Sequence, residues 1–221
     1  MRDGYHGLFR PLAYNALTLY GLILRQMGAK QEQLVIPQPH GSERHRLLFL
    51  ARRFLVPAFV VSLYGFLRWR ARISTRAEVE LSPNLRLGRH STVSSFTKIK
   101  VTDGPLVTGE RCGFATGCFI AVGAGGVEMG DNVICGPNVA IIATNYSYER
   151  VGVPLEEQGH TSVGIRIGHN VWIGANAVVL DGSVIGENSI VVANSLVNRR
   201  FPPNSIIQGN PAKVILQRQA A

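Results

Sequence analysis

Histidines are the side chains of this 221-residue sequence best suited to moving protons near neutral pH, because an imidazole titrates in that range. Three of the six lie in the N-terminal third: His6, His40 and His45. His90 and His169 fall within short repeats rich in Gly and Asn, where we expect turn residues. His160 stands near the end of a polar stretch, residues 143–164; it is either the best-placed candidate for a catalytic base or a solvated loop histidine.

The three cysteines, Cys112, Cys118 and Cys135, predict neither a metal site nor a disulfide framework. Their odd number and the lack of a secretory signal argue against disulfides. None has the CxxC partner that is typical of a structural zinc site. We therefore expect small buried apolar side chains and a reducing, cytoplasmic compartment.

The elements that position such groups follow a six-residue period. From residue 167 onward the sequence reads IGHNVW, IGANAV, VLDGSV, IGENSI, VVANSL, VNRRFP, and every unit begins with Ile or Val. The leading residues are Ile167, Ile173, Val179, Ile185, Val191 and Val197. Earlier and less regular units are led by Leu87, Val93, Thr108, Met129, Cys135 and Ile141.

This period predicts a mainly β fold, a parallel β-helix of stacked coils. A short strand plus a tight turn takes about six residues, and three such units complete one triangular coil. The leading aliphatic residue points into the core, and Gly, Asn and Asp adopt the turn geometry, including left-handed φ values. An α-helix would not hold apolar residues at every sixth place, and the strands of a β-sandwich recur at about 8–12 residues.

The repeat stops between Ile141 and Ile165. The intervening ATNYSYERVGVPLEEQGHTSVG, residues 143–164, is polar and contains Gly152, Pro154 and Gly159. We predict an excursion loop that leaves a rigid coil, and loops on rigid scaffolds are where chemistry usually lies.

The N-terminal third carries the whole net charge of +9. Residues 1–76 hold 12 Lys or Arg and 3 Asp or Glu, whereas residues 77–221 hold 11 of each. Apolar residues within 8–24 follow helical spacing, and residues 30–46 read as a linker. Residues 54–67 are uncharged, but this run is shorter than the ~20 residues that a membrane span needs.

Two interpretations of this N-terminal third stay open. Its helices lie at the membrane surface with arginines against anionic headgroups, or they pack against the β-helix or a neighbouring subunit. We do not expect nucleic-acid binding, because no groove-reading motif accompanies the charge.

The hexads, the stretch IGHNVWIGANAVV and the closing IIQGNPAKVI resemble the hexapeptide-repeat acyltransferases, which include maltose and galactoside O-acetyltransferases. The resemblance covers about residues 85–216 and is closest to the branch that acts in capsule and exopolysaccharide synthesis. It implies a left-handed β-helix, a homotrimer with active sites at subunit boundaries, and transfer from acetyl-CoA without a metal. The chain then divides into a basic, amphipathic helical region (1–72), a β-helix domain (73–206) and a C-terminal segment (207–221).

The resemblance also implies roles for single residues. Small residues along the coil edge are expected to make room for CoA: Gly174, Ala175 and Ala193. Cationic residues are expected to bind its phosphates: Arg199 (or Arg200) and Lys213. Turn geometry explains each glycine or alanine equally well. Trp172 and Glu149 are the expected substrate-binding residues.

The sequence departs from the family at its catalytic base, a His that follows Asn at the start of the loop. Here Asn145 is followed by Tyr146, and a phenol with an ordinary pKa of ~10 is a weak base. Either His160 substitutes, or Tyr146 and Asn145 only orient the acceptor and turnover is slow, or the chain is a non-catalytic scaffold. His169 is a fourth, minor candidate.

We therefore expect a cytoplasmic, membrane-surface, trimeric O-acetyltransferase that uses acetyl-CoA and acts on a saccharide or glycolipid precursor in polysaccharide biosynthesis. An N-acyltransferase acting on an amino sugar or a nucleotide sugar is the alternative within the same fold.

Overall fold

The computed structural model describes residues 35–36, 56–101 and 103–219 of the chain. The helix predicted within residues 8–24 lies outside these residues, as does most of the linker predicted at 30–46.

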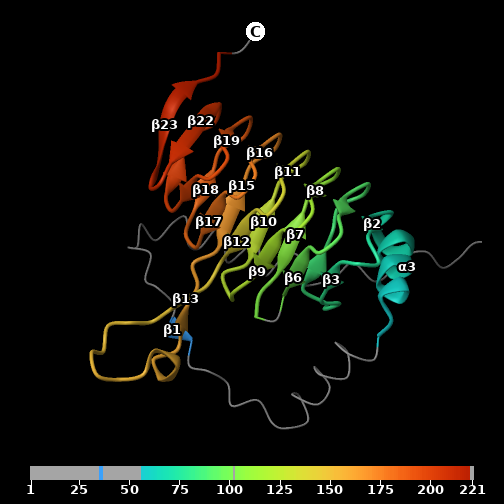
Figure 1. The fold of residues 1–221 in the computed structure, drawn as a ribbon, viewed down its shortest axis with the longest axis horizontal. Helices are drawn as coiled ribbons and strands as arrows, with labels where there is room; N and C mark the ends of the chain where they lie inside the picture. Colours follow the sequence, from blue (N-terminus) through green and yellow to red (C-terminus); the bar gives the residue numbers. More distant parts are fainter. Residues whose placement is uncertain (1–34, 37–55, 102, 220–221) are drawn as a thin grey trace, which may run out of the picture. The chain divides into compact units, whose positions relative to one another are not determined.

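Three parallel sheets form the walls of one coiled stack (Figure 1). Wall I contains, in spatial order, β2 (Arg72–Ile73), β5 (Thr92–Val93), β8 (Gly113–Phe114), β11 (Ile134–Cys135), β16 (Trp172–Ile173), β19 (Ile190–Val191), β22 (Ser205–Gly209) and β23 (Ala212–Gln217). Wall II contains β3 (Glu78–Val79), β6 (Lys98–Lys100), β9 (Phe119–Ala121), β12 (Ala140–Ile142), β17 (Val178–Leu180) and β20 (Leu196–Val197). Wall III contains β4 (Leu85–Arg86), β7 (Leu106–Thr108), β10 (Val127–Met129), β15 (Ile165–Ile167), β18 (Val184–Ile185) and β21 (Arg200–Phe201).

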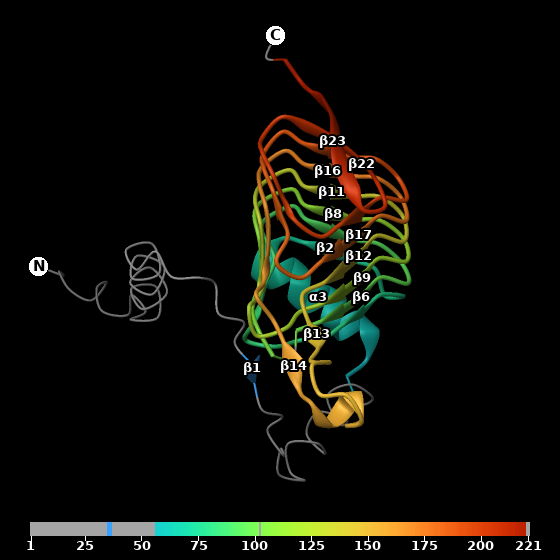
Figure 2. The ribbon, with the colours of Figure 1, turned by 90° about the vertical axis from the view of Figure 1, so that its left-hand side faces the viewer.

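The chain visits the walls in the fixed order I, II, III, so each circuit adds one strand to every wall. Successive coils overlie one another in Figure 2, and each strand pairs in parallel with its counterpart one coil later. The exception is β23, which turns back antiparallel to β22 at the C-terminal end of wall I. The stack therefore has three edges, here called corner I–II, corner II–III and corner III–I after the walls that they join.

The leading residues of the hexads fill the core, as the period predicts. Each is less than 7% exposed, from Leu87 and Val93 in the early coils to Val191 and Val197 in the late ones. Within wall III, Val127 and Met129 are buried whereas Glu128 between them faces outward. This alternation lets one coil bury aliphatic side chains and still pair its backbone with both neighbouring coils.

Asparagine dominates the left-handed turn positions. Seven asparagines have φ values between 55° and 60°: Asn132, Asn138, Asn170, Asn176, Asn188, Asn194 and Asn204. The predicted turn residue His90 has a φ of 61°. Asn tolerates this region better than other residues with a Cβ, because its short polar side chain can hydrogen-bond locally.

The three cysteines are buried and free, which confirms the expectation of small core side chains. Burial raises the pKa of the Cys112 and Cys118 thiols above 9.0 and that of Cys135 well above it. A buried thiol with a raised pKa is a poor nucleophile, so these groups contribute packing. Among the described residues, no cluster of His, Cys, Asp or Glu could hold a metal ion.

One long excursion leaves the stack after β12 and returns at β15. It contains β13 (Asn145–Tyr146), the short 3-10 helix η1 (Leu155–Glu157) and β14 (His160–Thr161). Strand β14 pairs antiparallel with β13 on one side and with β1 (Val35–Ile36) on the other. The predicted linker at 30–46 is therefore wrong at β1, where two β-branched residues supply an edge strand to the loop.

Helix α3 (Ala58–Trp69) stands before the first coil, at the opposite end of the stack from β23 (Figure 1). Gly65 is its buried residue, and a Cβ at that position would lie 2.5 Å from Cδ1 of Ile73 in β2. The helix thus covers the open end of the core. Within the described part of the chain, no helix is both long and apolar enough to cross a bilayer.

Candidate active site

His160 and Tyr146 face each other across the two strands of the excursion loop. They are partners in the antiparallel register of β13 and β14, and their ring centroids are 4.3 Å apart with an angle of 47° between the planes. His160 is half-buried and Tyr146 is 52% exposed. The imidazole of His160 therefore lies directly beside Tyr146, the position at which the family resemblance implies a histidine.

Asp181 holds the base of this loop. Its carboxylate accepts hydrogen bonds from the backbone N–H of Val163 at 2.8 Å and of Gly164 at 2.7 Å. It also accepts a longer one, 3.4 Å, from the side-chain amide of Asn145. Hydrogen bonds to a carboxylate are about twice as strong as those between neutral groups, so Asp181 ties both ends of the loop to the next coil.

Gln158 gives the loop its internal structure. The side chain is buried; its oxygen accepts from the backbone N–H of Arg150, and its amide donates to the carbonyls of Arg150 and Val153. These bonds satisfy backbone groups that no strand pairs. Next to Tyr146, the buried hydroxyl of Ser147 has no partner among the described residues.

Neither Asp181 nor Gln158 was among the predicted site residues. Asp181 lies 36 positions beyond Asn145, inside a regular hexad, where Asp is an ordinary turn residue. Gln158 stands in a polar stretch that offers no periodic signal. Neither residue could have been identified from its own position in the pattern.

The small residues expected to bind CoA lie together at corner I–II. Gly174 and Ala175 follow β16, and Ala193 occupies the same turn one coil later, after β19. Lys213 joins them, because it pairs with Gln208 near the end of β22, where the N–H of Gly209 donates to Ser195 in the turn of Ala193. Ala193 and Lys213 are exposed, and Ala175 is half-buried.

Gly174 has a structural role that is independent of any ligand. A Cβ there would lie 2.5 Å from the backbone nitrogen and 2.9 Å from the Cα of Ala193. Its counterpart Gly136 meets the backbone of Ala175 at 2.8 Å in the same way. The glycine is therefore explained by the close approach of successive coils.

Trp172 lies on the outer face of wall I. It is the outward residue of β16, 54% exposed, and in register with Ile134 and Ile190 of the adjacent strands. Ile134 is likewise 55% exposed. Trp172 thus belongs to an exposed apolar stripe close to corner I–II.

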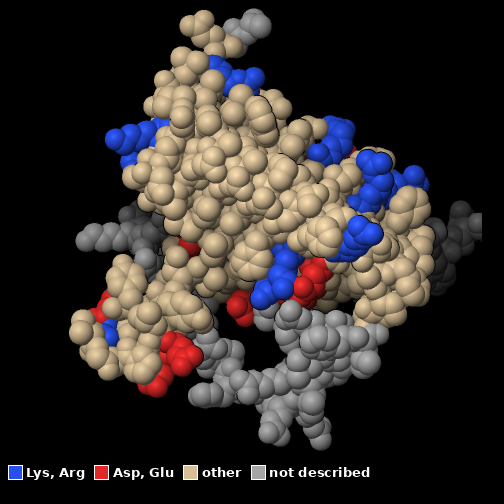
Figure 3. Space-filling view, in the orientation of Figure 1, with Lys and Arg blue, Asp and Glu red and all other residues tan. Residues whose placement is uncertain are grey.

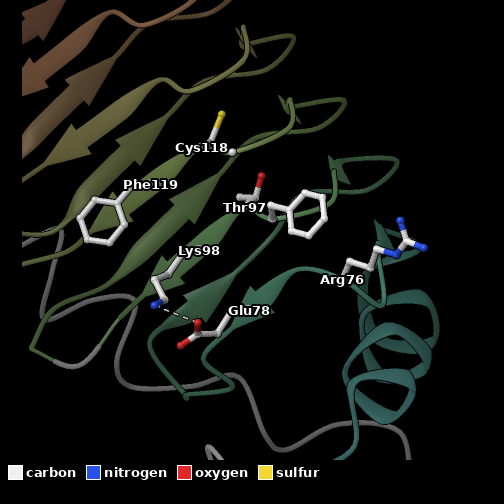
Figure 4. Close-up of a pocket in the computed structure, with 8 residues that line it drawn as sticks. Arg76, Glu78, Thr97, Lys98, Cys118 and Phe119 are labelled. Atoms are coloured by element: carbon white, nitrogen blue, oxygen red, sulfur yellow. Dashed lines mark ion pairs between the residues drawn. The ribbon is translucent and has the colours of Figure 1, made fainter.

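Corner I–II is hollowed over its first three coils. The hollow has a volume of about 390 Å³ and is lined by Arg76, Glu78, Phe96, Thr97, Lys98, Gly117, Cys118 and Phe119. Figure 4 shows Lys98 and Glu78 joined in an ion pair of 2.9 Å, with Arg76 directed away from them. The Arg76 guanidinium has no carboxylate or hydrogen-bond partner among the described residues, and Phe96 is 66% exposed. An aromatic face and an unpaired cation are suited to a ring that carries an anionic group.

The remaining predicted residues lie at corner II–III with the loop. Glu149 is exposed, and its carboxylate accepts from the backbone N–H of Tyr148. Arg199 lies between β20 and β21 and is exposed. The acidic side chains of the loop form a separate group at the lower left of Figure 3.

One chain thus holds the predicted residues at two different corners, separated by the width of wall II. The loop residues and Arg199 are at corner II–III, whereas Gly174, Ala175, Ala193 and Lys213 are at corner I–II. His169 lies at corner III–I, where its Nδ1 accepts from the backbone N–H of Asp131 at 3.0 Å. That hydrogen bond occupies one ring nitrogen of His169. Because His169 lies at a third corner, it is separate from the loop residues and from the small residues of corner I–II.

Residues 164–199 match the model of the bacterial transferase hexapeptide family, six repeats. That segment of the chain is therefore similar to the hexapeptide repeats of bacterial transferases. Over 90 residues, 40% of its length, the chain is 40% identical to galactoside O-acetyltransferase of Escherichia coli. The alignment spans 43% of that relative, less than half its length.

Two solved acyltransferases share the fold of this chain. AntD, an N-acyltransferase of Bacillus cereus in complex with dTDP and 3-hydroxybutyryl-CoA, superposes with a TM-score of 0.61 at 21% identity, over 68% of this chain and 81% of AntD. A hexapeptide-repeat acetyltransferase of Vibrio cholerae complexed with acetyl-coenzyme A gives 0.54 at 20% identity, over 83% and 93%. The predicted left-handed β-helix and the resemblance to hexapeptide-repeat acyltransferases are confirmed.

Proposed function

We propose that this protein transfers an acyl group, acetyl in the simplest case, from acyl-CoA to a hydroxyl of a saccharide or glycolipid precursor in polysaccharide biosynthesis, with His160 as the general base. The observation that carries the proposal is the pairing of His160 with Tyr146 on the excursion loop, at a ring separation of 4.3 Å. The similarity to a galactoside O-acetyltransferase supports the reaction class.

In this reaction the loop has to remove one proton from the acceptor hydroxyl. A sugar hydroxyl is a poor nucleophile near neutral pH, so a base must accept its proton as the oxygen attacks the thioester carbonyl carbon. The neutral imidazole of His160 accepts that proton, the new ester C–O bond forms, and the C–S bond breaks. The CoA sulfur leaves as thiolate and takes up the proton from the imidazolium, which restores the base.

Tyr146 supports His160 in this scheme. Its ring packs against the imidazole and limits the rotation of that side chain, and its phenol is an ordinary hydrogen-bond donor toward an acceptor. The scheme needs no base at position 146 itself. It therefore favours an active enzyme over the scaffold interpretation.

We place the acyl-CoA along corner I–II and the acceptor in the hollow at its early coils. Ala175 and Ala193 offer little steric obstruction on this corner, and Lys213 supplies a cation for a CoA phosphate. Coils are about 4.8 Å apart, so the hollow lies within roughly two coil spacings of Ala175. Arg76 and Phe96 then suit a sugar that carries a phosphate or carboxylate.

Because the loop and corner I–II are separated within one chain, we propose that a complete site forms between two chains of a homotrimer. The loop of one subunit supplies His160, and corner I–II of its neighbour supplies the surface for acyl-CoA. A closed cyclic trimer gives three equivalent sites of this kind.

The direct test is acceptor-dependent release of CoA from acetyl-CoA with a panel of neutral, anionic and amino sugars. We expect release with a hydroxyl acceptor, and His160→Ala to lower kcat by about 10²–10⁴-fold while acetyl-CoA binding measured by calorimetry is unchanged. The matched control is His169→Ala, which should leave kcat unaffected.

Other outcomes separate the alternatives. An unchanged kcat in His160→Ala removes His160 as the base, and acetyl-CoA binding without transfer to any sugar favours the scaffold. Transfer to amino sugars only would make the protein an N-acyltransferase, the activity named for AntD.

A further inference from the structure

The outer side of helix α3 is an apolar face with no partner among the described residues. Phe59, Leu63, Phe66 and Leu67 recur at helical spacing and are 53–72% exposed. Val60 and Tyr64 flank them at 38% and 44%. This set of six, here called the α3 face, puts large apolar side chains in water on a helix of only 12 residues. Such patches on soluble proteins mark sites of interaction.

The orientation of the helix is fixed by its other side. Val61, Gly65 and Trp69 recur at intervals of four; Gly65 meets Ile73 of the first coil, and Val61 and Trp69 pack against the core. The Trp69 ring also meets Tyr64 edge-on, with centroids 5.3 Å apart. Rotation of α3 to hide the α3 face would therefore expose the end of the β-helix core.

Positive charge borders the C-terminal end of this face. Arg68, Arg70 and Arg72 are all exposed, and residues 56–77 contain no Asp or Glu. Figure 3 shows Lys and Arg side chains bordering the end of the molecule that carries α3. Apolar side chains beside arginines, without acidic neighbours, are typical of a helix that binds the interface of an anionic membrane.

We propose that α3 docks the protein on an anionic lipid surface, with the α3 face in the acyl-chain boundary and the arginines at the headgroups. A helix of 12 residues is about 18 Å long, well short of the ~30 Å hydrocarbon core, so α3 lies along the surface. The inference is independent of catalysis at the loop, and its test does not use the enzyme activity.

Charge argues against the other occupants of this face. Two copies docked through α3 would bring the same arginines together, because a two-fold contact pairs each patch with itself. Residues 1–55 are also basic, with 8 Lys or Arg against 3 Asp or Glu. An anionic surface is the complement that relieves this charge.

Flotation of the full chain with vesicles tests the proposal. We expect the wild type to float with phosphatidylglycerol-containing vesicles, less with phosphatidylcholine alone, and less again at high salt, because the arginine contribution is screened. Leu63→Ser with Leu67→Ser should reduce the bound fraction at least tenfold. The matched control is Val151→Ser with Leu155→Ser, which removes two apolar side chains that are 100% and 54% exposed on the loop, and it should float like the wild type.

Thermal unfolding and light scattering of the same variants complete the test. The Leu63/Leu67 variant should keep the wild-type melting temperature and oligomeric state. A wild type that does not float, together with a destabilised variant, would mean that the chain itself covers the α3 face. A change of oligomeric state without a change in flotation would assign the face to a second copy. Either result overturns the proposal.

Discussion

Gly174 lies under the backbone of the following coil, where a methyl group would come within 2.5 Å of the Ala193 nitrogen. The sequence alone leaves its small size open to two explanations, a cofactor surface or a turn. The close spacing of the coils favours the packing explanation, because the backbones at Gly174 and Ala193 cannot move apart without breaking the parallel hydrogen bonds between coils. The proposed CoA surface at corner I–II is therefore better tested at the exposed Ala193.

Gly174→Ala should destabilise the fold, because the added methyl meets backbone and forces coil displacement. We expect a loss of about 1–3 kcal/mol in the free energy of unfolding, measured by denaturant titration. Gly113→Ala is the control: its Cβ would meet only the Thr92 hydroxyl at an ordinary 3.5 Å. Equal stability of the two variants would contradict the packing explanation for Gly174.

The residues that the sequence predicted well are those whose environment repeats. Val179 and Ile185 are buried because each occupies the same phase of a six-residue period, which is a local signal. The contact of His160 with Tyr146 depends on the register of two strands 14 positions apart, and that register is set by η1 and Gln158. The six-residue period of the sequence does not indicate this register. The pairing of Ile36 with His160 is longer in range still, so the sequence pattern predicts a linker where the structure has β1.

At the scale of elements, the excursion loop is a small sheet anchored at its base. Asp181 supplies the anchor from the next coil, and Ser162 adds to it, since its hydroxyl donates to the Ala143 carbonyl and accepts from the Gly125 N–H. These bonds fix where β13 and β14 leave the stack. The imidazole of His160 therefore depends for its position on a carboxylate that does not touch it.

Asp181→Asn should lower kcat about tenfold and leave the KM for acetyl-CoA unchanged, because the loop shifts while corner I–II is untouched. Asp131→Asn is the matched control, a carboxylate that accepts the Glu110 N–H at 2.7 Å at corner III–I, whereas the loop leaves the stack at corner II–III. Both variants should lose about 1–3 kcal/mol of stability. A fall in kcat that is the same for both would assign Asp181 to stability alone.

On the scale of the whole molecule, the β-helix separates three surfaces. The α3 face lies at the first coil, β23 at the last, and the corners carry the candidate chemistry between them. In the proposed homotrimer, if its axis is set along the stack, the three α3 helices would share one end. Three weak lipid contacts on one rigid body then bind far more tightly than one, because the second and third are intramolecular. Acceptors linked to lipid would be met at the same surface.

Sharing of the site between chains is tested by mixing two inactive variants. His160→Ala removes the proposed base at corner II–III, and Ala193→Trp blocks the exposed surface of corner I–II without entering the core. Each variant alone should show no acceptor-dependent CoA release. Mixed trimers, isolated through two different affinity tags, should recover about a third of the wild-type rate, because one boundary in each joins an intact loop to an intact corner. A site contained in one chain would stay inactive in every mixture, since each chain carries one of the two defects.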